Sequence, residues 1–229
     1  GKPLTAADVV YSWERATAPA TGSPTAATYL GDIAGVAAKM AGEAETISGL
    51  AVVDDRTLAV TLAAPRAQFL AKLTYPVAFV VDRENVEVGE SWVTAPNASG
   101  PFTLRTLRPN DGVVFERNPA YHTPAGVRYV AYLFAALELV GPLYEAGEID
   151  IGFVDATTAV RVRDTSDPLN AEWLHTTSLC TITFRLDLNR PPLDDPQVAQ
   201  ALVLALDRDG LSSALGGTAN VKAETILPP

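Results

Sequence analysis

The chain has 229 residues, 48% of them hydrophobic and 19% charged, so it can bury a sizeable core and is not globally disordered. Its net charge of −10 argues against nucleic acid as a partner and against binding to an anionic membrane surface. A single cysteine, Cys180, excludes zinc ribbons and disulfide scaffolds, and no run of about 18 apolar residues predicts a membrane span.

The first predicted element is a short helix near the start of the chain. Thr5 and Asp8 have the spacing of a capping box, and Pro19 marks the end of the helix. Between them lies an apolar stripe at helical spacing, formed by Val9, Val10, Trp13 and Ala16. Because the sequence opens in mid-pattern, without Met or a signal peptide, we expect it to be a piece of a longer chain.

A β-hairpin is predicted next. Residues 50–53 and 57–62 flank the turn sequence Asp54-Asp55-Arg56, and apolar and polar residues alternate, which is typical of strands with one solvated face. The other predictions up to residue 92 are a loop at 17–28, a short helix within 29–46, one or two helical turns at 68–73, a buried strand at 77–81 and an ambiguous segment at 86–92.

The second half of the chain combines strands and helices. A second hairpin is predicted around Asn110-Asp111-Gly112, and the sequence from His122 to Gly126 is typical of a linker. Strands are then predicted at 127–134, 148–153 and 181–188, and helices at 138–146, at 156–163 after Asp155, after Asp195-Pro196 with a buried stripe of Val198, Ala201, Leu202 and Ala205, and before Gly216-Gly217. This alternation predicts a mixed α/β fold.

Catalytic and metal-binding motifs are poorly represented. His122 and His175 lie in no recognisable catalytic motif, and surface positions explain both better. Asp207-Arg208-Asp209-Gly210 begins like a calcium loop, but the full spacing is missing and capping of a helix by Asp209 fits better. Cys180 lies in an apolar strand pattern, which suits either a buried thiol or half of a disulfide. We therefore predict no catalytic residue, no metal site and no cofactor.

Several short motifs occur in a characteristic order. They are Gly1-Lys2-Pro3-Leu4-Thr5-Ala6-Ala7-Asp8-Val9-Val10-Tyr11-Ser12-Trp13-Glu14-Arg15, Ile47-Ser48-Gly49-Leu50, Asp54-Asp55-Arg56-Thr57-Leu58, Ser99-Gly100-Pro101-Phe102, Glu116-Arg117-Asn118-Pro119-Ala120-Tyr121, Tyr144-Glu145-Ala146-Gly147-Glu148-Ile149-Asp150, Pro191-Pro192-Leu193-Asp194-Asp195 and Ala205-Leu206-Asp207-Arg208. Together they resemble family 5 solute-binding proteins of ABC transporters, the peptide/nickel class. Ser23-Pro24 and Leu179-Cys180-Thr181 resemble the oligopeptide-binding branch.

The resemblance implies the clamshell of type II periplasmic binding proteins, here as an incomplete fragment. Residues 1–122 would form most of the smaller lobe, and residues 127–229 part of the main ligand-binding lobe. The ligand positions carried over from the family are Phe153, Val154, Asp155, Thr183, Arg185 and Thr25. At Thr25 relatives carry an aromatic residue, so this sequence departs from the pattern. The resemblance also implies that a partner for Cys180 would lie in the second half of the protein.

The function implied is that of the substrate-binding component of an ABC importer. The ligand would be an oligopeptide or a related small solute such as a nickel chelate, a sugar or an opine, and the protein partners would be the permease subunits. We expect a periplasmic or extracellular location, with membrane attachment only through an anchor outside this segment. The alternatives are a hydrolase on a related scaffold, which requires two carboxylates of perturbed pKa in one pocket, and a peptide sensor or chaperone-like binding protein.

Overall fold

The structure is a computed structural model that describes residues 2–176, 181 and 183–216. The chain divides into two compact units, residues 1–134 and 135–229, which are considered separately below. Cys180 lies outside the described residues, so its surroundings are not tested.

The predicted first helix is present as α1 (Ala6–Ala16). The backbone N–H and the hydroxyl of Thr5 both donate to the Asp8 carboxylate at 2.8 Å, which confirms the predicted capping interaction. Trp13 is buried, and its indole N–H donates to the carbonyl of Ala78 at 2.9 Å. This helix therefore anchors a segment that lies 65 residues further along the chain.

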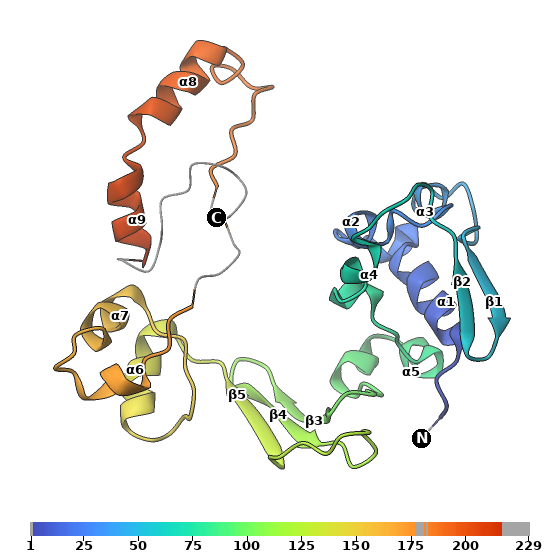
Figure 1. Ribbon diagram of the computed structural model, residues 1–229, viewed down its shortest axis with the longest axis horizontal. Helices are drawn as coiled ribbons and strands as arrows, with labels where there is room; N and C mark the ends of the chain where they lie inside the picture. Colours follow the sequence, from blue (N-terminus) through green and yellow to red (C-terminus); the bar gives the residue numbers. More distant parts are fainter. Residues whose placement is uncertain (1, 177–180, 182, 217–229) are drawn as a thin grey trace. The chain divides into compact units, whose positions relative to one another are not determined.

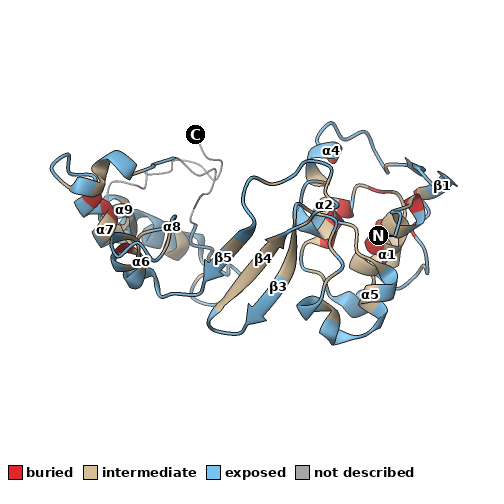
Figure 2. Cartoon of the chain, turned by 90° about the horizontal axis from the view of Figure 1, so that it is seen from below, coloured by how far each residue is buried: buried red, intermediate tan, exposed pale blue. Residues whose placement is uncertain are grey.

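The first unit holds the main hydrophobic core. Two short helices, α2 (Ala26–Leu30) and α3 (Val36–Met40), occupy part of the region where one short helix was predicted. Gly35 separates them with a φ of 88°, a conformation that continues neither helix. Figure 2 shows buried residues gathering near α1, α2 and α4. The core cluster is Trp13, Leu30, Ile33, Val36, Ile47, Phe69 and Ala78.

The first predicted hairpin is confirmed. β1 (Leu50–Asp54) pairs antiparallel with β2 (Thr57–Val60), and Leu58 and Val60 pack against the core while their neighbours face solvent. The helical turn predicted at 68–73 is present as α4 (Phe69–Lys72). These local elements follow from sequence signals that act over a few residues.

The buried strand predicted at 77–81 is wrong. The structure has a 3₁₀ turn there, η2 (Pro76–Ala78), followed by irregular backbone. The backbone N–H of Val81 donates to the Ser12 hydroxyl at 2.9 Å, so a side chain of α1 satisfies a group that a neighbouring strand would otherwise bind. The ambiguous segment after it forms α5 (Arg83–Glu87) and η3 (Glu90–Thr94).

A three-stranded antiparallel sheet completes the first unit (Figure 1). Its order is β3 (Phe102–Arg108), β4 (Gly112–Arg117) and β5 (Tyr129–Leu133). Asn110 takes a positive φ of 67° in the predicted turn between β3 and β4. Because β5 pairs with β4, the first unit extends to Phe134 and the division falls after the linker expected at 122–126.

The second unit is helical in its described part. It contains α6 (Leu137–Glu145), α7 (Ala156–Val162), the 3₁₀ turn η4 (Pro168–Glu172), α8 (Pro196–Ala205) and α9 (Arg208–Gly216). The strands predicted at 148–153 and 181–188 are not found among the described residues of those segments. No described segment pairs with them, and a strand exists only when another strand supplies its hydrogen bonds.

The buried stripe predicted on α8 is also wrong. The Asp195 side chain caps this helix as predicted, accepting from the backbone N–H of Gln197 at 2.8 Å. None of its residues is buried, however, and Leu202 and Leu204 are 47% and 78% exposed. The apolar pattern is present, but no described element covers it. At α9, the side chain of Asp207 rather than Asp209 accepts the capping bond, from Gly210.

Candidate functional site

The predicted ligand contacts Phe153, Val154 and Asp155 lie in the segment 151–155, which connects α6 and α7 and has no regular secondary structure. Gly147 reverses the chain after α6 with a φ of 72°. Ile151 and Phe153 follow, and their side chains are 86% and 89% exposed. Large apolar side chains are seldom so exposed, and here two of them alternate along one stretch of backbone. The segment therefore offers an uncovered apolar surface.

Gly152 positions this segment against α6. A Cβ atom at residue 152 would overlap a methyl group of Val140 in α6, so a larger residue at this position would force the Val140 side chain to shift. The sequence analysis did not single out this residue. Its signal was a glycine between two large apolar residues, a pattern that often marks a close backbone approach.

Asp155 ends the segment and begins α7. Its carboxylate accepts a hydrogen bond from the backbone N–H of Thr158 at 2.7 Å. That bond, together with one from the Thr158 hydroxyl, holds the pKa of Asp155 below its ordinary value. Asp155 is thus an anionic helix cap, and in this structure its side chain supports α7. Val154 beside it is half-buried.

Thr183 and Arg185 also belong to the second unit, and both are exposed. The backbone at these two residues is neither helical nor paired as a strand. Arg185 forms no ion pair with any described residue. Its guanidinium group therefore keeps its donors for another group.

Thr25 lies in the first unit, whereas the other five predicted ligand residues belong to the second unit. It precedes α2, and its carbonyl accepts from the backbone N–H groups of Thr28 and Tyr29, both at 3.1 Å. One turn further on, Tyr29 stacks on Tyr75 with ring centroids 3.7 Å apart. An aromatic pair thus lies one helical turn away from Thr25, the position at which the family resemblance implies an aromatic residue.

The chemistry of catalysis has little support in the described part of the chain. His122 and His175 are exposed, as predicted. The described residues contain no group of His, Cys, Asp and Glu side chains suited to a metal ion. Where a carboxyl pKa is clearly shifted there, at Asp32, Asp54, Asp82, Glu116, Asp155 and Asp164, the shift is downward. Hydrogen-bond donors and cations stabilise these anions, whereas a general acid requires a raised pKa.

Among the described helices, none has both the length and the apolar character needed to cross a membrane.

Comparison with known proteins gives a consistent result. The model of the family described as bacterial extracellular solute-binding proteins, family 5 Middle, matches residues 1–229. The periplasmic oligopeptide-binding protein OppA of Escherichia coli is 33% identical over the whole chain, and the probable deoxycholate-binding periplasmic protein YgiS of the same species is 34% identical. The chain spans only 44% of the length of each of these relatives.

Solved structures agree with the sequence matches. OppA of Burkholderia pseudomallei has a TM-score of 0.89 and 27% identity, covering the whole chain and 46% of that protein. OppA of Haemophilus influenzae, in complex with the peptide RPPGFSPFR, has a TM-score of 0.86 and 25% identity, with the same coverage. The predicted type II periplasmic-binding-protein fold is therefore confirmed, and the chain corresponds to less than half of it.

Proposed function

Because the chain belongs to the family 5 bacterial extracellular solute-binding proteins, we propose that it is part of the substrate-binding component of an ABC importer. The whole protein would bind oligopeptides in a cleft between two lobes and deliver them to permease subunits. The observation that carries this proposal is the family match over all 229 residues, together with relatives whose names and complexes include oligopeptides. The family consists of binding proteins rather than enzymes.

The lobes are assigned within this proposal. Residues 1–122 would form most of the smaller lobe and residues 127–229 part of the ligand-binding lobe. The exposed segment 151–155 then supplies one wall of the cleft, with Phe153 as its apolar contact and the backbone as its hydrogen-bonding surface. Extended peptides are commonly bound through main-chain hydrogen bonds, with pockets for their side chains. Thr183 and Arg185 would contribute from the same lobe.

The first test is native mass spectrometry of the full-length protein, purified without refolding. A heterogeneous set of co-purified masses that match short peptides and disappear on denaturation would support the proposal. A single sharp mass or a metal ion would indicate a dedicated solute and overturn the assignment to oligopeptides. The full-length protein is required because this chain spans less than half of its relatives.

A pair of variants tests the role of the 151–155 segment. Phe153→Ala removes the exposed ring, and we expect peptide affinity to fall about tenfold, as for a central apolar contact. Leu174→Ala is the matched control, because Leu174 is 91% exposed but lies outside the segment. Equal peptide affinity in the two variants would show that Phe153 is not a contact.

A second ligand class follows from one relative. The 34% identical YgiS carries the name of a probable deoxycholate-binding protein, so an amphipathic steroid acid is the alternative occupant of the same cleft. The apolar side chains of Ile151 and Phe153 suit such a ligand as well as an apolar peptide side chain. Competition of deoxycholate with a mixture of short peptides, measured on the full-length protein, distinguishes the two.

The location and partners complete the proposal. We place the protein outside the cytoplasmic membrane, with a lipoprotein anchor outside this segment as the means of attachment. Genes for permease and ATPase subunits next to the coding gene would support uptake. Their absence would favour the peptide sensor or chaperone-like alternative, which uses the same binding site.

A further inference from the structure

Positive charge is concentrated in the segment that forms the three-stranded sheet. Residues 101–134 carry four arginines, Arg105, Arg108, Arg117 and Arg128, against two carboxylates, Asp111 and Glu116. This gives the segment a net charge of +2. Because the whole chain carries −10, the remaining residues together carry −12. A local positive potential on an acidic protein attracts anions to that surface.

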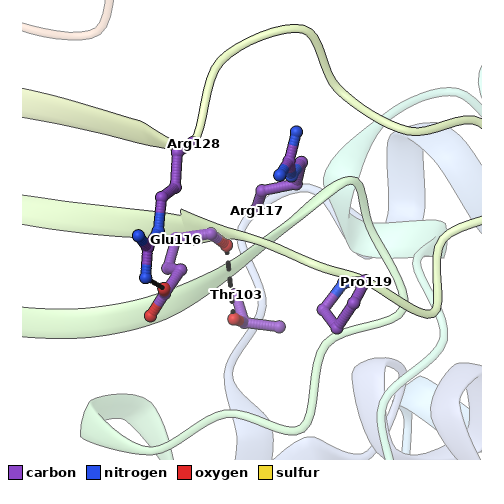
Figure 3. Close-up of a pocket in the computed structure, with 5 residues that line it drawn as sticks. All are labelled: Thr103, Glu116, Arg117, Pro119 and Arg128. Atoms are coloured by element: carbon purple, nitrogen blue, oxygen red, sulfur yellow. Dashed lines mark hydrogen bonds and ion pairs between the residues drawn. The ribbon is translucent and has the colours of Figure 1, made fainter.

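A pocket lies at one end of this sheet, within the first unit. It has a volume of about 460 Å³ and is lined by Thr103, Glu116, Arg117, Pro119 and Arg128. Figure 3 shows that Glu116 and Arg117, which are neighbours on β4, extend to opposite sides of the strand, while Arg128 reaches toward Glu116. Two arginines and one glutamate thus line the pocket, and the Arg117 side chain lies on the other side of β4 from that of Glu116.

The carboxylate of this pocket is already neutralised. Glu116 lies 2.8 Å from Arg105 and 3.5 Å from Arg128. Burial raises the pKa of Glu116, but hydrogen bonds from Tyr129 and Arg105 and the charges of both arginines outweigh it and lower the pKa. Glu116 therefore remains an anion whose charge is balanced by Arg105 and Arg128, so it does not neutralise a further arginine of the pocket.

Of the two arginines that line the pocket, Arg117 has no counter-charge among the residues that the structure describes. One of its terminal nitrogens donates to the carbonyl of Ala125 at 3.1 Å, which braces the loop between β4 and β5. No carboxylate of the described residues lies within ion-pair distance of it. A guanidinium group has five N–H donors, so Arg117 retains donors for a ligand in the pocket.

We propose that this pocket binds a compact oxyanion, a carboxylate or phosphate group, through Arg117. Guanidinium groups match the planar geometry of carboxylate and the oxygens of phosphate, and such charge-assisted bonds are among the strongest in proteins. The hydroxyl of Thr103 on the same pocket wall already donates to the backbone carbonyl of Glu116, at 3.4 Å, so the donors for the ligand come from Arg117. This site goes beyond the proposed function, because it uses none of the peptide-contact residues.

The test is titration of the full-length protein with sodium phosphate and, separately, with sodium acetate, at constant ionic strength set with sodium chloride. Arginine Nε–H signals in ¹H–¹⁵N spectra are followed. We expect a saturable shift at Arg117, and a loss of affinity of about tenfold in Arg117→Gln. Arg108→Gln is the control, since Arg108 pairs with Asp111 and does not line this pocket.

Two further arms separate the remaining explanations. Arg117→Lys keeps the charge and should restore part of the affinity, whereas a purely structural role in bracing the loop would lower thermal stability without this rescue. Binding to vesicles that contain phosphatidylglycerol would identify the ligand as a lipid headgroup, and failure to bind them would identify it as a free anion. Shifts that never saturate, or equal affinity in Arg117→Gln and Arg108→Gln, would overturn the proposal, and neither result bears on peptide binding at Phe153.

Discussion

Trp13 connects two distant parts of the first unit through one side chain. Its ring is buried in the core, and its N–H satisfies the carbonyl of Ala78. Trp13→Phe removes the donor and part of the ring, so we expect a loss of about 2 kcal/mol or more in the free energy of unfolding of this unit. Urea denaturation followed by circular dichroism measures it.

Trp92→Phe is the control for this substitution. Trp92 is half-buried, and its recorded partner is the Arg15 guanidinium group 5.7 Å from the ring centroid. We expect a loss below about 1 kcal/mol, because such an exposed cation–π contact contributes little. Equal losses in the two variants would mean that the Trp13 hydrogen bond adds no stability.

Asp32 makes the stability of the first unit depend on pH. The hydrogen bond from Lys72, at 2.6 Å, is the main cause that lowers its pKa, and Arg66 at 3.3 Å adds to it. A carboxyl whose pKa is lowered in the folded state stabilises the protein above its unfolded pKa, and this contribution disappears as the pH falls through the folded value.

Asp32→Asn tests this dependence. We expect wild type to melt at a higher temperature than the variant at neutral pH, and the difference to shrink below about pH 4, where carboxyl groups take up protons. Lys72→Gln removes the main hydrogen-bond partner of Asp32. The melting temperature of this variant should therefore also depend less on acid pH than that of wild type. A difference between wild type and Asp32→Asn that stays constant down to low pH would contradict the assignment.

Helix caps were the features that sequence predicted best at the scale of single elements. The sequence predicts that helices begin after Asp155 and Asp195, and both side chains accept a capping bond from the backbone, since a cap depends only on residues within one turn. Strands at 77–81, 148–153 and 181–188 were not found in the described residues, because an apolar run becomes a strand only beside a partner. Gly152 between two apolar residues signals a close backbone approach, but the sequence does not identify Val140 as the residue it packs against.

Asp155 caps α7 and is also a predicted ligand contact, and two substitutions separate these roles. Asp155→Ala removes the bond to Thr158, and we expect faster amide hydrogen exchange within α7. Asp155→Asn keeps a capping oxygen but loses the charge, so exchange should stay near the wild-type rate. If Asp155→Asn nevertheless weakens peptide binding in the full-length protein, the charge of Asp155 acts on the ligand as well as on the helix.

The described core is distributed unequally over the chain as a whole. Nine buried hydrophobic residues lie in the first unit, whereas Ala159 and Val162 are the buried hydrophobic residues described in the second. Exposed large apolar side chains occur in both units, but those described as at least 78% exposed, Ile151, Phe153, Leu174 and Leu204, all lie in the second unit. Burial of apolar surface is the main favourable term in folding, so the two units differ in the stability that this segment alone can give them.

Limited proteolysis of the 229-residue segment, expressed by itself, tests this difference. We expect rapid cleavage within residues 135–229 and a resistant product that contains the core of residues 1–134, because cleavage follows the population of locally open states. In the full-length protein the same sites in the second unit should be protected, since its apolar surface then has other segments to pack against. Equal resistance of both units in the isolated segment would show that the second unit folds without further chain.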